Sequence, residues 1–127
     1  MGVLGIGGLF FRASDPEALT AWYREHLNVG PGCGAPGAGK SDEYSWMASG
    51  GPVVFMPFKD DTDYFPAEKA YMLNLRVSDI DGLIERLKDA GIAVETRDEW
   101  NDPSIGRFAR VHDPEGNPVE LWQPPAS

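Results

Sequence analysis

The sequence has little of what most metal and disulfide sites require. Its 127 residues include one cysteine, Cys33, and two histidines, His26 and His112. A single cysteine forms no internal disulfide, and so few Cys and His residues predict no zinc cluster. Basic residues are also scarce, because 11 Lys and Arg stand against 20 Asp and Glu, a net charge of −9. Nucleic acids and anionic membranes need a basic footprint, so we expect neither as a partner.

Long apolar runs are missing as well. The apolar residues 1–15 have no basic leader and no cleavage site, and Arg12 and Asp15 interrupt them. They predict a first strand, not a signal peptide or a membrane segment. We therefore expect a soluble, cytoplasmic protein. The length suits one core and one domain, residues 1–127.

The chain contains an internal repeat. RASDPEAL, from Arg12, and RVSDIDGL, from Arg76, match at Arg, Ser, Asp and Leu with an offset of 64 residues. In both copies a strand-like run is followed by Ser-Asp and then by a helical pattern. Ser14 and Ser78 each have an acidic residue three positions later, which is the spacing of a capping box.

Strand candidates follow each predicted helix. The first half offers EYSWMAS and PVVFMPF, and the second offers IAVETRDEW, GRFARVH and NPVELWQ. Asp113 begins an Asp-Pro-Glu-Gly sequence that favours a type I turn between the last two. The predicted class is α+β, with two βαβββ modules (about 1–58 and 70–124) joined by a linker, 59–69. The modules pair into one curved mixed sheet with the helices outside and a cup-shaped pocket inside.

Strand alternation separates the side chains that face the cup from those that pack on the helices. It places Asn74 and Arg76 in the cup on one strand and Glu120 and Trp122 on the last strand, and it leaves the direction of Arg110 open. The repeat adds the equivalent positions on the first strand, and Trp46 and Phe55 complete an aromatic wall. The candidate ligand-binding residues are Phe10, Arg12, Trp46, Phe55, Met72, Asn74, Arg76, Glu120 and Trp122.

Three features together resemble one protein superfamily: the Ser-Asp helix starts, the sequence WYREHLNV and above all GRFARVHDPEGNPVELWQP. They are similar to the vicinal oxygen chelate superfamily, which includes glyoxalase I, bleomycin-resistance proteins and extradiol dioxygenases. The resemblance covers nearly the whole chain. It implies a homodimer, and in the metal-dependent members it implies ligands from the first, fourth, fifth and eighth strands.

These ligand positions are largely lost in this chain. The resemblance places them at Gly8, at Met56 or Phe55, at Met72 and at Glu120. Among them only Glu120 binds hard or borderline divalent ions, since a thioether is too soft. Catalytic metals need about three protein ligands, so we expect no metal and no cofactor.

Three functions remain as hypotheses. The first is a metal-independent small-molecule-binding protein of the glyoxalase/bleomycin-resistance type that sequesters an aromatic or cationic ligand in the cup. The alternative is a metal-free isomerase or lyase with Glu120 as the catalytic general base. A metal-dependent lyase or dioxygenase is disfavoured by Gly8 and Met72. Glu120 also has a purely structural interpretation, an internal ion pair with Arg76 or Arg12.

A glycine-rich segment after the first helix matches a nucleotide-binding motif only by its letters. GAPGAGKS, from Gly34, fits the P-loop pattern. A P-loop follows a buried strand and opens a helix, whereas this segment follows a helix and a Gly/Pro run. We therefore predict no nucleotide site there.

Overall fold

The computed structural model describes residues 9, 11, 13–34, 46–50 and 59–125. The regular elements of this part of the chain are α1 (Pro16–Leu27), β1 (Leu73–Arg76), α2 (Ile80–Asp89), the 3-10 turn η1 (Asp98–Trp100), β2 (Arg107–His112) and β3 (Pro118–Gln123). They confirm the predicted α+β class. PVVFMPF and most of GAPGAGKS, predicted from the sequence, lie outside the described residues. Of EYSWMAS, Met47 forms a single parallel bridge with Gly34.

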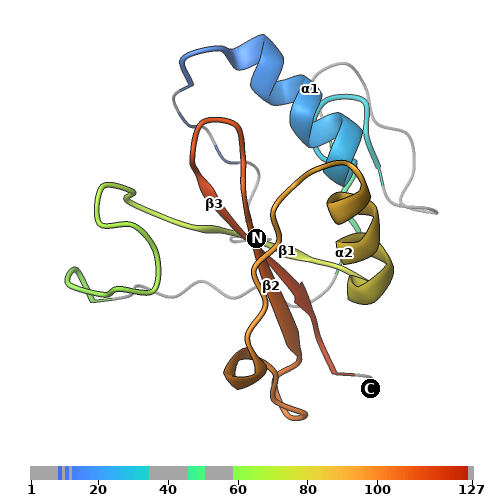
Figure 1. Cartoon of the computed structure of the whole chain (residues 1–127). Helices are drawn as coiled ribbons and strands as arrows, with labels where there is room; N and C mark the ends of the chain where they lie inside the picture. The colour runs from blue at the N-terminus through green and yellow to red at the C-terminus, as the bar shows by residue number, and fades with distance from the viewer. Residues whose placement is uncertain (1–8, 10, 12, 35–45, 51–58, 126–127) are drawn as a thin grey trace, which may run out of the picture.

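The strands form a small mixed sheet in the order β1-β3-β2 (Figure 1). β3 lies in the middle, parallel to β1 and antiparallel to β2. The predicted Asp-Pro-Glu-Gly turn joins β2 to β3: the Gly116 N–H donates to the Asp113 carbonyl at 2.9 Å. Gly116 has a φ of 80°, which glycine adopts without steric cost.

The helix starts differ from the predicted capping boxes by one residue. The N-caps are Asp15 and Asp79, not Ser14 and Ser78, and each carboxylate accepts the N–H three positions later. An aspartate side chain reaches this N–H as well as serine does, and its charge also suits the positive end of a helix. The end of α1 is as predicted, since Asn28 adopts a left-handed conformation with a φ of 57°.

Both helices pack on one face of the sheet, while residues 59–70 loop out on the other side (Figure 1). The predicted alternation in β1 is confirmed, because Leu75 is buried against the helices and Leu73 packs beside it. The buried core consists of Leu19, Tyr23, Leu75, Ile80, Leu87, Ala109, Val111, Val119 and Leu121. This core fixes which side chains of the three strands point away from the helices.

The predicted strand IAVETRDEW is largely wrong. Glu95 alone pairs with β2, through two backbone hydrogen bonds of 2.8 Å to Arg110. After Glu95 the segment has no alternating apolar residues, and it turns into η1. The consequence for the site is that Trp100, at the end of η1, is brought back to the sheet beside Arg110.

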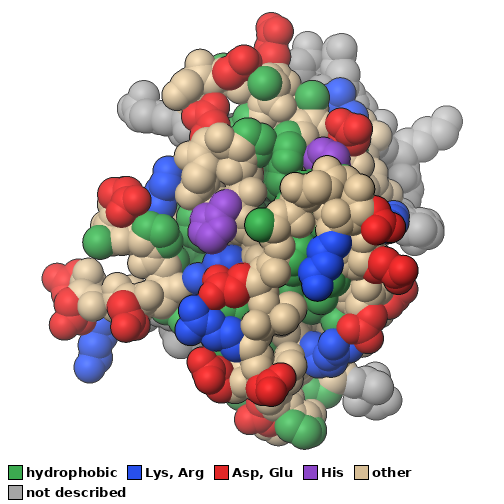
Figure 2. Space-filling view, in the orientation of Figure 1, with side chains coloured by type: hydrophobic (Ala, Val, Ile, Leu, Met, Phe, Trp, Pro, Cys, Tyr) green, Lys and Arg blue, Asp and Glu red, His purple; other side chains and the backbone are tan. Residues whose placement is uncertain are grey.

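On the face shown in Figure 2, acidic side chains are spread out with Lys and Arg between them. This distribution fits a solvated surface with a net charge of −9. No helix in the described part of the chain is long and apolar enough to cross a membrane.

Candidate functional site

The sheet face opposite the helices carries the polar and aromatic side chains of all three strands, and we call it the Glu120 face. Residues paired across neighbouring strands point to the same side. The sheet register therefore defines two rows on this face. One row is Asn74, Glu120 and Arg110, and the next is Arg76, Trp122 and Phe108.

Glu120 is buried, with 8% of its surface exposed, and both of its carboxylate oxygens accept hydrogen bonds. Asn74 Nδ2 donates to Oε1 at 2.8 Å, and the Tyr64 hydroxyl donates to Oε2. Burial and this bond to Glu120 raise the pKa of Tyr64 to about 12, so the phenol stays protonated at neutral pH. A carboxylate between apolar strand residues is tolerated here because its neighbours satisfy it.

The sequence alone offered Arg76 or Arg12 as the ion-pair partner of Glu120. Within the described part of the chain, Arg76 forms no ion pair with Glu120, and its Nη2 donates to the carbonyls of Ser49 and Gly50 at 2.9 and 3.1 Å. Arg76 lies in the row of Trp122 and not in that of Glu120. Arg12 lies outside the described residues.

Arg110 points to the Glu120 face, and two aromatic rings contact its guanidinium. Its Nη1 donates to the Tyr64 carbonyl at 2.6 Å. The guanidinium carbon lies 4.5 Å from the centroid of the Tyr64 ring and 5.1 Å from that of Trp100. The two rings meet edge to face, with their centroids 6.0 Å apart. Tyr64 therefore contacts both charged residues of the Asn74–Glu120–Arg110 row: Glu120 through its hydroxyl, and Arg110 through its ring and carbonyl.

Sequence reasoning missed Tyr64 and Trp100. Tyr64 lies in the predicted linker, where its aromatic ring amid acidic residues was the available signal. Trp100 lay in a segment predicted as a strand. The sequence left open which way the Arg110 side chain points. In the sheet Arg110 is paired with Glu120, so both side chains point to the same face.

Trp122 is fixed at the edge of the face. Its ring stacks on Phe108 with 6.3 Å between the centroids, and its Nε1 donates to the Ile105 carbonyl at 2.9 Å. Gly106 makes room for it: a Cβ there would lie 2.7 Å from Nε1 and 2.3 Å from the Gln123 carbonyl oxygen.

The remaining candidates are spread more widely. Trp46 is exposed and Met72 is half-buried. Phe10, Arg12 and Phe55 lie outside the described residues. The structure thus brings together Asn74, Arg76, Glu120 and Trp122 on one face.

The described residues around Glu120 do not fit a divalent metal. In the described ranges no three His, Cys, Asp or Glu side chains are close enough to hold an ion. Arg110 lies on the neighbouring strand, directly opposite Glu120, and its positive charge opposes a second cation there. We therefore derive no chemistry through a metal.

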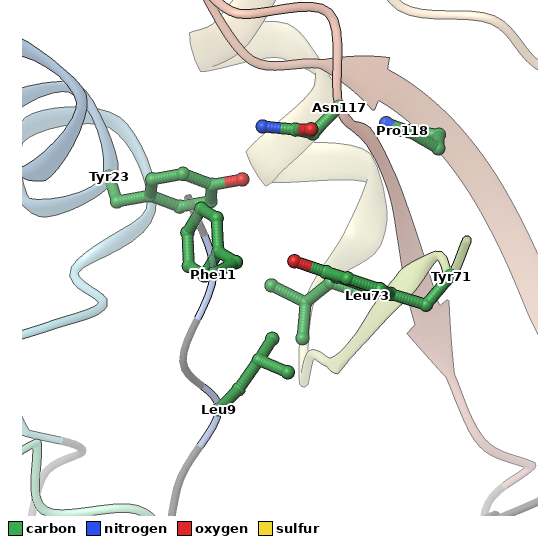
Figure 3. A pocket seen from close by; sticks show the side chains of 7 residues that line it. All are labelled: Leu9, Phe11, Tyr23, Tyr71, Leu73, Asn117 and Pro118. Atoms are coloured by element: carbon green, nitrogen blue, oxygen red, sulfur yellow. The ribbon is translucent and has the colours of Figure 1, made fainter. Parts of the chain in front are cut away.

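A small crevice lies on the other side of the sheet, between α1 and the start of β3 (Figure 3). It is lined by Leu9, Phe11, Tyr23, Tyr71, Leu73, Asn117 and Pro118. Its volume of about 10 Å³ holds roughly one water molecule. The crevice is therefore too small to be the ligand site.

The turn that carries the strongest part of the resemblance is structural. Asp113, with 4% of its surface exposed, accepts hydrogen bonds from the N–H groups of Glu115 and Asn117, the Asn117 amide and the Tyr23 hydroxyl. The Glu115 carboxylate accepts the N–H groups of Ser14 and Asp15 at 2.7 and 2.9 Å. The turn thus joins the second half of the chain to the start of α1.

Comparisons with known proteins agree with this fold. The antibiotic binding protein TnmS3 from Streptomyces sp. CB03234 is 24% identical, with a TM-score of 0.61 and 98% of each chain covered. A glyoxylase/bleomycin resistance protein/dioxygenase domain from Frankia sp. EAN1pec is 23% identical, with a TM-score of 0.56 and coverage of 97% of this chain and 99% of that one. A search of curated proteins found no significant match. Residues 8–122 match the family described as glyoxalase-like domain, and the chain therefore belongs to that family.

Proposed function

We propose that this protein is a metal-independent small-molecule-binding protein of the glyoxalase/bleomycin-resistance type, with its ligand on the Glu120 face. The observation that carries the proposal is the row of Asn74, Glu120 and Arg110, contacted by the rings of Tyr64 and Trp100. A few converging polar groups among aromatic rings are typical of ligand sites. The family supports small-molecule binding in general, and the Streptomyces relative is described as antibiotic binding.

The contacts of Glu120 suit a residue that holds Tyr64 and Asn74 in place better than they suit a general base. A base needs an oxygen directed at the proton that it removes. Each oxygen of Glu120 already accepts a hydrogen bond from another side chain of the same protein, Asn74 or Tyr64. This is the reason to place a binding function ahead of the isomerase or lyase alternative.

A thermal-shift screen of small aromatic compounds, neutral and charged, tests the proposal. Isothermal titration calorimetry then measures the affinity of each hit for wild-type protein, for Glu120→Gln and for a matched control variant, Glu99→Gln. The carboxylate of Glu99 is exposed. We expect Glu120→Gln to change ligand affinity by about tenfold, or roughly 1.4 kcal/mol, because the face loses a buried charge, and Glu99→Gln to leave the affinity unchanged. Ligands that bind both variants equally well would contradict the proposed site.

Metal independence has its own test. Mass spectrometric metal analysis of protein dialysed against EDTA should find far less than one ion per chain, and ligand affinity should not change. Near-stoichiometric zinc, iron, nickel or manganese that restores lost binding would overturn this part of the proposal.

Assembly and location stay predictions. The resemblance implies a homodimer, which sedimentation velocity at several concentrations tests. The sequence predicts a cytoplasmic location, which cell fractionation tests. It also predicts no nucleic-acid partner, which a binding assay with duplex DNA tests.

A further inference from the structure

Arg110 has an unsatisfied buried guanidinium. The residue is 6% exposed, and of its side-chain nitrogens Nε and Nη2 are buried without a hydrogen-bond partner among the described residues. Nη1 alone is accounted for, by the Tyr64 carbonyl. Burying a charged donor without a partner is costly, so native structures rarely leave such atoms unpaired without a reason.

The protein's own acids do not neutralise this charge. Glu120 lies directly opposite in the sheet register, yet within the described ranges no carboxylate oxygen comes within 4.0 Å of Arg110. The two oxygens of Glu120 accept from Tyr64 and Asn74 instead. The cation–π contacts with Tyr64 and Trp100 stabilise the guanidinium but accept no N–H.

The two unpaired atoms have the geometry of a binding edge. Nε–H and one N–H of Nη2 lie side by side on the planar guanidinium, and this fork matches the two oxygens of a carboxylate. We infer that Arg110 is the anchor for an anionic ligand, an aromatic carboxylate whose ring packs against Tyr64 or Trp100. This inference rests on the proposed function and narrows the ligand class to aromatic anions. The acidity of the chain alone had suggested a cationic ligand instead.

The ligand reaches this edge only if the packing around the guanidinium opens, and the rings of Tyr64 and Trp100 lie against that guanidinium. Both unpaired atoms are closed off from solvent, and the rings beside them come from residues 59–70 and from η1, outside the sheet. Tyr64 is held in place by its hydroxyl on Glu120. Binding therefore changes the surroundings of Trp100, and tryptophan fluorescence is a direct reporter.

Three probes with one ring separate the charge from the shape: benzoate, benzamide and benzamidine. Titrations up to about 10 mM suit the affinity expected of such small compounds. We expect wild-type protein to bind benzoate at least about tenfold more tightly than the neutral and cationic probes. Arg110→Met should abolish this preference, and Arg110→Lys should reduce it, because lysine keeps the charge without the fork. Arg107→Met is the matched control on the same strand, since its guanidinium pairs with Asp81 on the helix side, and should retain the preference.

Nitrogen-15 spectra of the arginine side chains give a second readout that needs no variant. Benzoate should shift the Nε–H signal of Arg110 and leave that of Arg107 in place. Absence of benzoate binding, or a preference that survives in Arg110→Met, overturns the inference. A third outcome is that benzoate does not bind, whereas benzamidine or benzamide binds in a way that depends on Glu120. That result overturns the anion site alone and leaves the proposed function standing.

Discussion

Two buried acids of one hairpin have opposite surroundings. Asp113, in the turn, accepts four hydrogen bonds, two of them from backbone N–H groups. Glu120, seven residues later, accepts two from side chains and lies opposite an arginine that keeps two unpaired nitrogens. Each acid is contacted by one tyrosine hydroxyl, Tyr23 or Tyr64. A fully satisfied network indicates a structural role, whereas a buried polar group without a partner calls for an explanation, and for Arg110 our explanation is a bound ligand.

The largest expected effect is on stability at the turn. Asp113→Ala leaves two half-buried backbone N–H groups, those of Glu115 and Asn117, that cannot turn away, and we expect it to lower the free energy of unfolding by about 3 kcal/mol. Glu120→Ala frees only a phenol and an amide that can reorient, so about 1 kcal/mol is expected. Urea unfolding followed by circular dichroism measures both. Equal losses would remove the distinction between the two acids.

The two tyrosines sharpen the comparison. Tyr23→Phe and Tyr64→Phe each remove one hydroxyl from a carboxylate and should each cost about 1 kcal/mol of stability. Only Tyr64→Phe should also raise the affinity for benzoate, by about fivefold, because the lost bond no longer holds the ring over Arg110. Parallel urea unfolding and fluorescence titrations measure this, and a rise in Tyr23→Phe as well would contradict a gating role for Tyr64.

The predictability of the two regions from sequence also differs. Local rules were enough for the turn, because Asp-Pro-Glu-Gly between two alternating strands specifies it. Strand alternation was likewise enough to place Asn74, Glu120 and Trp122 on one face. The Glu120 face also depends on contacts over long sequence distances. Tyr64 lies 56 residues before Glu120 in the sequence and 46 residues before Arg110, and it contacts both. A residue in a linker or a 3-10 turn has no periodicity that reveals its partner. For that reason Tyr64, Trp100 and the surroundings of Arg110 became visible only in the structure.

A smaller effect is expected when the unpaired guanidinium is removed. Arg110→Met replaces a buried, partly unsatisfied charge by a shorter apolar chain, so the free energy of unfolding should stay within about 1 kcal/mol of wild type or rise. Arg107→Met loses an exposed ion pair with Asp81 and should cost at most about 1 kcal/mol. A loss of 3 kcal/mol or more in Arg110→Met, measured by urea unfolding, would make Arg110 a structural residue like Asp113.

The smallest effect concerns alkaline pH. The pKa of Tyr64 is raised to about 12 by burial and by the bond to Glu120, against about 10 for an unfolded chain. A group whose folded pKa is raised stabilises the fold fully below the unfolded pKa, and this contribution is lost as the pH rises through the folded value. Wild-type protein should therefore lose stability between about pH 10 and pH 12, and Tyr64→Phe should lose less over this window. Tyr23, whose pKa is also raised by burial and by its bond to Asp113, remains in both proteins, so the difference isolates Tyr64. Urea unfolding at a series of pH values, together with tyrosinate absorbance, measures it, and identical pH profiles would mean that the hydroxyl of Tyr64 is not held by Glu120 in solution.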